Sequence, residues 1–158
     1  MKEVAVVLLV TLMLNGCGSS STTPPQASTA PGVWSADLPG GIGPASGLSF
    51  TTQFTLNGDG SLSITYFQFL TQGTCFPISG GTETGSMVLT TNTTTNAVTG
   101  TFTYTVESGG NTLTLTGTVT GTANGITLSG GSISGTWSLT GATGCVASGQ
   151  SFTMSQTS

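Results

Sequence analysis

Only a few side chains in this chain carry groups that do nucleophilic, acid–base or metal chemistry. The 158 residues contain three cysteines, five acidic residues, one basic residue and no histidine. A serine or cysteine nucleophile needs a neighbouring base, usually histidine or lysine, and the one basic residue is Lys2, at the start of the chain. The composition therefore predicts a protein that is not an enzyme and that uses no cofactor.

Four carboxylates remain for acid–base or metal chemistry once Glu3 is set aside with the N-terminal segment. Two carboxylates can form a hydrolytic pair, but these four are spread along the sequence and most fall near expected turns or strand ends. The run Asn57-Gly58-Asp59-Gly60 has too few acidic ligands for a calcium loop, so we interpret it as a turn. Zinc needs more histidine and cysteine ligands than the chain offers. We expect no metal site, and solvated charges at Asp37, Asp59, Glu83 and Glu107.

The lack of positive charge beyond Lys2 also restricts the partners of the protein. Nucleic-acid binding depends on lysine and arginine side chains that neutralise phosphates, so nucleic acid is excluded as a partner. The same lack excludes attraction to anionic headgroups through a basic patch.

Cys17 stands at the end of an N-terminal run that has the features of an export leader. Lys2 supplies a charged start, residues 4–14 are mostly apolar, and Leu14-Asn15-Gly16 precede the cysteine. The apolar run is shorter than the ~20 residues that span a bilayer and has the length of a cleavable leader. The alternative is an ordinary secretory leader that is cut elsewhere.

The order of these residues resembles the signal of bacterial lipoproteins, in which the cysteine receives the lipid. The resemblance implies a signal peptide at residues 1–16 and lipidation of Cys17, with a diacylglyceryl group on its sulfur and an acyl chain on its amino group. Two or more acyl chains anchor a protein stably. Because Gly18 is not an aspartate-type retention residue, the resemblance implies a cell-envelope protein anchored to the outer membrane, periplasmic or surface-exposed.

Lipidation of Cys17 would leave Cys75 and Cys145 as a pair. An exported chain lies in an oxidising compartment, where disulfides form and persist. We therefore predict a Cys75–Cys145 disulfide; the alternative is two separate free thiols. Residues 17–31 are rich in Ser, Thr, Pro and Ala and lack apolar periodicity, which predicts a flexible tether before a β domain at residues 32–158.

The β domain is predicted from the alternation of apolar and hydroxyl residues, which is typical of half-buried strands. In residues 101–106, for example, Phe102, Tyr104 and Val106 alternate with threonines. We expect an all-β fold of eight to ten antiparallel strands in up-and-down order, forming a barrel or a barrel-like sandwich. Closure is favoured because this domain has few charges to protect open sheet edges.

Glycines recur at inward positions in the middle of the expected strands, at residues 85, 100, 117 and 135. Such glycines mark bends or close approaches between strands. Matching the apolar faces of neighbouring strands predicts three hairpins: two-residue turns at Gly109-Gly110 and Asn124-Gly125, and a three-residue turn at Gly58-Asp59-Gly60. Residues 61–70 are apolar on both faces, which suggests that another segment or a partner covers them.

Gly32-Val33-Trp34 resembles the Gly-x-Trp that opens lipocalin-like barrels, although the domain lacks the arginine that packs on that tryptophan in the family. We expect Trp34 and Trp137 in the core. The expected function is a lipid-anchored module, used structurally or to bind a small neutral, mostly apolar ligand or an envelope partner. A surface adhesion or glycan-binding protein is the alternative. A third interpretation has the apolar face toward lipid, as in outer-membrane barrels.

Overall fold

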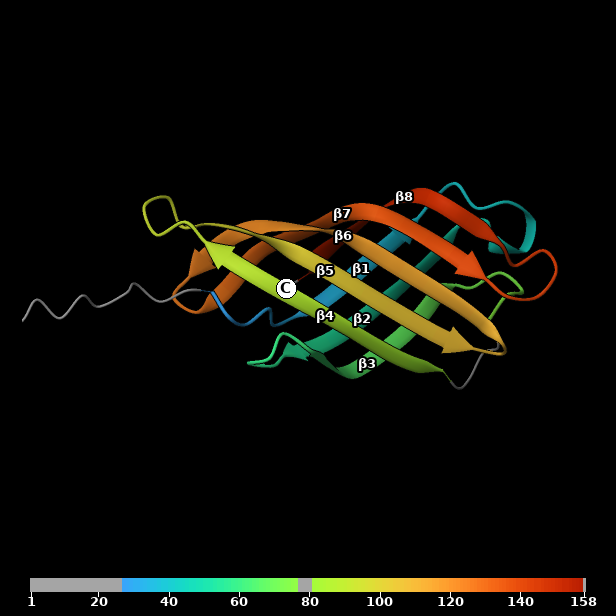
Figure 1. Ribbon diagram of the computed structural model, residues 1–158, viewed down its shortest axis with the longest axis horizontal. Coiled ribbons are helices and arrows are strands. Elements are labelled where there is room, and N and C mark those ends of the chain that lie inside the picture. Colours follow the sequence, from blue (N-terminus) through green and yellow to red (C-terminus); the bar gives the residue numbers. More distant parts are fainter. Residues whose placement is uncertain (1–26, 77–80, 158) are drawn as a thin grey trace, which may run out of the picture.

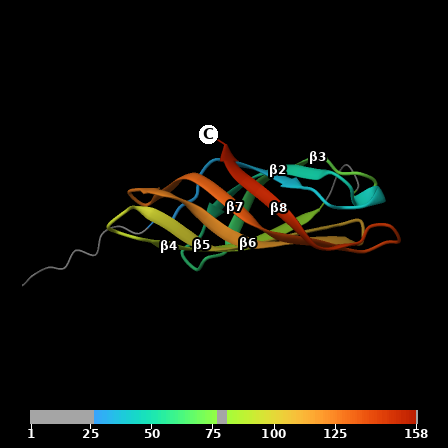
Figure 2. The same ribbon diagram turned by 90° about the horizontal axis from the view of Figure 1, so that it is seen from above.

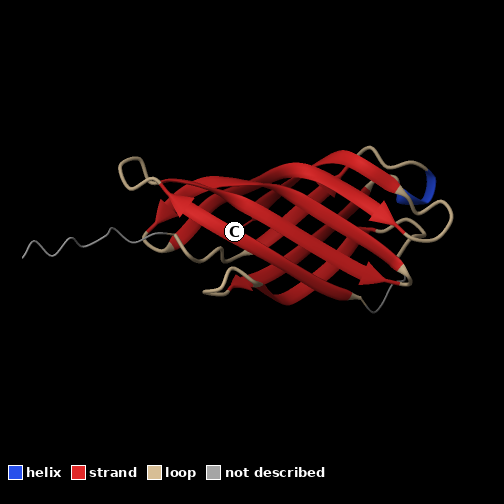
Figure 3. Ribbon diagram, viewed as in Figure 1, coloured by secondary structure: helices blue, strands red, loops and turns tan. Residues whose placement is uncertain are grey.

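The computed structural model describes residues 27–76 and 81–157 as a barrel of eight antiparallel strands (Figures 1 and 3). This confirms the all-β, up-and-down prediction. A single 3-10 turn, Gly43–Ala45, interrupts the loop between the first two strands. The strands are β1 Val33–Leu38, β2 Leu48–Leu56, β3 Leu62–Thr71, β4 Thr82–Thr91, β5 Ala97–Ser108, β6 Asn111–Asn124, β7 Thr127–Thr140 and β8 Ala147–Thr157.

The strands form one sheet in the order β3-β2-β1-β8-β7-β6-β5-β4. Figure 2 shows β2 and β3 on one side of the molecule and β4, β5 and β6 on the other, with β7 and β8 between them. The sheet therefore curls until its two outer strands, β3 and β4, meet. Ser61, directly before β3, forms an isolated bridge with Ser86 of β4, and the Met87 amide donates a hydrogen bond of 2.8 Å to the Gly60 carbonyl in the same turn. The barrel is nearly closed by backbone pairing.

Side-chain packing completes the closure between β3 and β4. Leu62 of β3 lies against Gly85 of β4, where an added Cβ would come within 2.9 Å of the leucine Cδ1 atom. Met87 and Leu89 of β4 are buried as well. The two edge strands of the sheet thus contact each other at the start of β3, which leaves the barrel nearly closed.

The core lies inside the barrel and follows the alternation in the sequence. Its largest fully buried side chains include both tryptophans, as expected, and most threonines of the strands face outward. Thr52 is an exception, because it is fully buried. The core also contains Tyr104, Phe50, Phe102, Phe152, Leu38, Leu48, Met87, Leu113, Leu115 and Leu128.

The mid-strand glycines allow close approach between strands, as predicted. Gly117 of β6 is directly opposite Gly135 of β7, and these glycines are flanked across the sheet by Phe102 and Phe152. A Cβ atom at Gly135 would overlap the Thr116 carbonyl. The strands can therefore approach here because two neighbouring positions lack side chains.

The β5–β6 hairpin has the predicted register. Ser108 pairs with Asn111, and Phe102, Tyr104 and Val106 are opposite Gly117, Leu115 and Leu113. Gly109 and Gly110 have φ values of 59° and 78°, and positive φ at both central residues defines a type I′ turn.

The predicted Asn124-Gly125 turn of the β6–β7 hairpin is wrong by one residue. Asn124 pairs with Thr127, so Gly125 and Ile126 form the turn. Gly125 has a φ of 60° whereas Asn124 does not adopt a positive φ, which fits a type II′ turn with glycine first. A bulge on β7, where Gly130 and Gly131 are opposite Gly121, shifts the register by one residue, so that Val119 is opposite Ile133.

The predicted three-residue turn between β2 and β3 is confirmed by the pairing of Leu56 with Leu62 and of Thr55 with Ser63. Two register shifts then follow, one of them between Gln53 and Phe54. The shift places Tyr66 outside, whereas Ile64 before it and Phe67 after it pack against the core. A bulge in the pairing therefore explains the apolar residues on both faces of this strand.

Candidate functional site

The four carboxylates of the barrel lie on separate parts of it. Asp37 is exposed on β1, and Asp59 is in the β2–β3 turn. Glu83 pairs with Val106 and Glu107 pairs with Thr82, so the two glutamates project to opposite faces of neighbouring strands. Among the described residues, no three His, Cys, Asp or Glu side chains lie close enough to hold a metal ion.

Asp59 stabilises its own turn. The amide and the hydroxyl of Ser61 both donate to its Oδ1 atom, at 2.9 and 2.6 Å. These hydrogen bonds lower the pKa of the exposed carboxyl. This geometry is that of an Asx turn, which agrees with the interpretation of residues 57–60 as a turn.

Tyr104 places a phenol inside the barrel. Its hydroxyl lies 2.8 Å from the Thr52 hydroxyl, which in turn donates to the Tyr66 carbonyl at 3.0 Å. The phenol is therefore the donor in the first bond. Burial raises the pKa of Tyr104, against the opposing effect of the Thr52 hydrogen bond, and the charge of Glu83 raises it further. A phenol that stays protonated in this way is a structural donor.

Aromatic rings fill the interior around this pair. Phe50 lies 5.7 Å from Tyr104 and 5.1 Å from Phe67, measured between ring centroids. Phe54, which lies on β2 like Phe50, stacks on Trp34 with 5.7 Å between the ring centroids. Such offset contacts are favourable beyond the apolar area they bury, and these rings lie inside the barrel.

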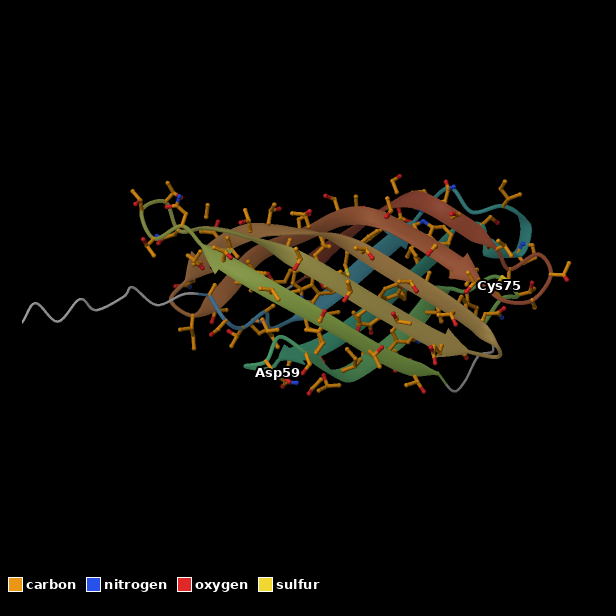
Figure 4. All side chains as sticks on the ribbon, viewed as in Figure 1. Asp59 and Cys75 are labelled. Atoms are coloured by element: carbon orange, nitrogen blue, oxygen red, sulfur yellow. A yellow bond between two sulfur atoms is a disulfide. The ribbon has the colours of Figure 1, made fainter. Side chains whose placement is uncertain are left out.

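One end of the barrel, here called the disulfide end, is formed by the loops at residues 39–47, 72–76 and 141–146. The predicted Cys75–Cys145 disulfide joins two of these loops (Figure 4). Pro44 lies between Gly73 and Gly144, so the third loop packs against both. The Trp137 indole donates to the Pro39 carbonyl at 3.0 Å. The three loops therefore form one connected cap.

Asn111 is a second link within this cap. Its side chain is buried, donates to the Cys75 carbonyl and accepts a hydrogen bond of 2.8 Å from the Ala142 amide. Sequence reasoning missed this role, because an asparagine after two turn glycines looks like part of the turn.

The opposite end, here called the tether end, carries the turns at residues 57–60, 92–96 and 125–126. Residues 27–31, which composition assigned to the tether, pack against this end. Ser28 and Thr29 donate backbone hydrogen bonds to the Ile126 carbonyl, and the Leu128 amide donates to Thr29 at 2.7 Å. Ala27 and Ala30 are buried. The chain therefore contacts the barrel before Gly32. Residues 27–31 are held by backbone hydrogen bonds and buried alanines, although their sequence lacks an apolar pattern.

Gln156 fixes this segment to the sheet. Its side-chain amide donates to the Pro31 carbonyl at 2.5 Å and the Leu128 carbonyl at 3.2 Å, and it accepts from the Gly131 amide at 2.8 Å. The Trp34 indole also points to this segment, 3.4 Å from the Ala30 carbonyl.

Three open grooves border residues 27–32. They have volumes of about 360, 490 and 560 Å³. The first is lined by Ala27, the 57–60 turn and the end of β4, the second by Gln156 and the start of β7, and the third by Phe54 and Thr65. Backbone groups and hydroxyls accompany apolar side chains in the linings of all three.

Cys17, the predicted lipidation site, lies outside the described residues. Within the parts of the chain that the structure describes, no helix is long and apolar enough to cross a membrane. No protein-family model, curated protein or solved structure matches this chain.

Proposed function

We propose that this chain is a lipid-anchored, non-enzymatic protein of the bacterial cell envelope, whose barrel is a structural scaffold. The observation that supports the scaffold is the aromatic packing inside the barrel, where Phe50 contacts Tyr104 and Trp34 contacts Phe54. Eight-stranded barrels are often just wide enough to be filled by side chains. A rigid, nearly uncharged body suits a module that displays a surface or holds a position in the envelope.

The anchor is supported by the leader-like residues and Cys17. Growth of cells with a radiolabelled fatty acid tests it. We expect the wild-type protein to carry the label and to be found with the membranes, and Cys17→Ala to lose both properties. Cys75→Ala is the matched control, because it removes a cysteine without removing the anchor. Equal labelling of wild type and Cys17→Ala would refute the proposal.

A small neutral ligand, in this proposal, would occupy the grooves beside residues 27–32 rather than the barrel interior. The polar atoms there are backbone carbonyls and hydroxyls, which suit an uncharged molecule. Native mass spectrometry of protein extracted gently from membranes measures this directly. A retained mass that is lost when Thr127 is replaced by tryptophan would support a groove ligand. Recovery of the protein without a bound molecule would argue against a groove ligand and support the structural role.

Glycan binding is the alternative, and the rows of hydroxyls across the outer surface favour it. Thr103, Thr116, Thr136 and Ser151 form one row across four neighbouring strands, because each is paired with the next. Ser86 extends the row with a hydrogen bond of 2.7 Å to Thr103.

A glycan array separates this alternative from the scaffold. Binding that is lost in Thr116→Val but kept in Thr55→Val, a change on the distant strand β2, would support recognition by the row. Absence of binding to every sugar would remove the alternative.

A further inference from the structure

We infer that the tether end of the barrel faces the lipid bilayer and that the disulfide end points away from it. The inference rests on the proposed anchor at Cys17, and it assigns the lipid-facing surface to the turns at residues 57–60, 92–96 and 125–126. Two observations on the described residues and the length of the connecting sequence carry it.

The first observation is the place where the chain meets the barrel. The Ala27 amide donates to the Thr91 hydroxyl at 2.9 Å, at the end of β4, and the Ser28 amide donates to the carbonyl of Ile126 in the β6–β7 turn. Both partners belong to the tether end. The chain that connects Cys17 to the barrel therefore arrives at this end and at neither the side nor the cap.

The second observation is the length of that connection. Cys17 and Ala27 are ten residues apart in the sequence, and ten fully extended residues span at most ~35 Å. A coil of the same length averages roughly 17 Å between its ends. Strands β6 and β7 have 14 residues each, which at about 3.3 Å per residue and a tilt near 40° gives a barrel about 35 Å long. The cap could reach the bilayer only with the connection stretched to its limit.

The third observation is the distribution of charge. Asp37 is the second-last residue of β1, Glu83 the second of β4 and Glu107 the second-last of β5, so all three lie toward the disulfide end. Asp59 is the one carboxylate among the described residues of the tether end. Anionic headgroups repel carboxylates over about a Debye length, so this distribution turns the cap away from the membrane.

Exposed apolar side chains are present at both ends, so they favour neither end as the one that faces the membrane. Ile126 is 53% exposed at the tether end, and Ile42 is 84% exposed in the cap. In the inferred orientation, Ile126 lies beside the headgroups. Ile42 and Val146 are then presented outward on loops that the disulfide, Asn111 and Pro44 hold in place.

Fluorescence quenching on the full-length lipidated protein tests this orientation. Ile126→Cys and Ile42→Cys each provide one free thiol for a fluorophore, since Cys75 and Cys145 are paired and Cys17 would be lipidated. The labelled proteins are reconstituted in phosphatidylcholine vesicles that contain a lipid with a nitroxide at the headgroup. We expect severalfold stronger quenching at residue 126 than at residue 42. Thr94→Cys, in the exposed 92–96 turn, is a second tether-end position that should behave as residue 126.

Equal quenching at the two ends, or stronger quenching at residue 42, would overturn the orientation. Flotation of the same vesicles distinguishes this result from failure of the anchor. Protein that floats with the vesicles but shows reversed quenching contradicts the orientation alone. Protein that does not float contradicts the anchor and removes the basis of the orientation with it.

Discussion

Thr52 and Tyr104 show how a single polar contact can be kept inside an apolar barrel. The phenol of Tyr104 donates to Thr52, and Thr52 donates to the backbone of Tyr66. The two residues are not equivalent, because Thr52→Val leaves the buried phenol without its acceptor whereas Tyr104→Phe leaves Thr52 bonded to Tyr66. An unsatisfied buried group costs about 1–3 kcal/mol, and a lost hydrogen bond about 1 kcal/mol.

We therefore predict that Thr52→Val lowers the free energy of unfolding more than Tyr104→Phe does. Urea unfolding followed by fluorescence measures both. A larger loss for Tyr104→Phe would contradict the assigned direction of the hydrogen bond.

The same tyrosine predicts how stability depends on pH. Burial raises the pKa of Tyr104 in the folded protein, so the unfolded chain loses its phenol proton first as the pH rises. The stabilisation is complete below the unfolded pKa of about 10 and decreases as the pH rises above it. Unfolding measured from pH 8 to 11 should show this decrease in the wild type and a smaller one in Tyr104→Phe. Identical slopes would mean that the phenol ionises equally in both states.

Gly135 tests the close approach of β6 and β7. A Cβ atom there would overlap the carbonyl of Thr116, whereas a Cβ atom at Gly58 would meet open space. Overpacking costs about 1–3 kcal/mol, and a change at an exposed site usually costs less than ~0.5 kcal/mol. We expect Gly135→Ala to lower the melting temperature clearly and Gly58→Ala to leave it nearly unchanged. Equal effects would argue against a packing role for Gly135.

Single residues also mark the limit of prediction from sequence. The alternation of β2 places Thr52 inside, because it lies between the inward residues Phe50 and Phe54. Its hydrogen-bond partner Tyr104 lies on β5, distant in the sequence, so the buried polar pair could not be predicted. Asn111 and Gln156 were missed for the same reason, because their partners are backbone groups distant in the sequence.

At the scale of elements, the bulged pairing of β2 with β3 decides which side chains of β3 enter the core. Phe67 lies 4.9 Å from Phe69 and 5.1 Å from Phe50, between ring centroids, whereas Tyr66 is 43% exposed. Burial of a phenylalanine contributes about 1.5–3 kcal/mol. In thermal unfolding, the loss of stability in Phe67→Ala should therefore be up to several times larger than the loss in Tyr66→Ala. The reverse order would show that β3 pairs without the bulge.

The disulfide links two loops of the cap across a sequence separation of 70 residues. Closing a loop of this size stabilises the folded state by up to about 4 kcal/mol in the chain-entropy model. The double variant Cys75→Ser/Cys145→Ser should unfold at a lower urea concentration than the oxidised wild type. Reductant should shift the wild type toward the variant and leave the variant unchanged. If reductant does not change the urea concentration at which the wild type unfolds, the disulfide does not contribute to its stability.

Hairpin registers were predictable to the extent that turn chemistry was unambiguous. Gly109-Gly110 permits positive φ at both central positions, and the register of β5 with β6 followed from it. Asn124-Gly125-Ile126 offers two turns one residue apart, and the structure adopts the one that needs positive φ at glycine only. Face matching could not choose between them, because moving the turn by one residue shifts the pairing by two residues and leaves every side chain on the same face.

At the scale of the whole molecule, the barrel is a nearly closed body with little charge and with a different structure at each end. Closure was predictable from the scarcity of charges for edge protection. The packing of residues 27–31 was not, since they lack an apolar pattern and are held by backbone pairing and Gln156. The aromatic packing inside the barrel, the contacts of residues 27–31 at the tether end and the disulfide-linked cap are the features on which the proposal of a scaffold held at a membrane rests.

The intact mass of the protein purified from cell membranes tests this account most directly. We predict a chain that begins at Cys17, carries the mass of a diacylglyceryl group and an acyl chain, and is two hydrogens lighter than its reduced form. A chain recovered with an unmodified Cys17, or one cut after that residue, would contradict the proposed anchor.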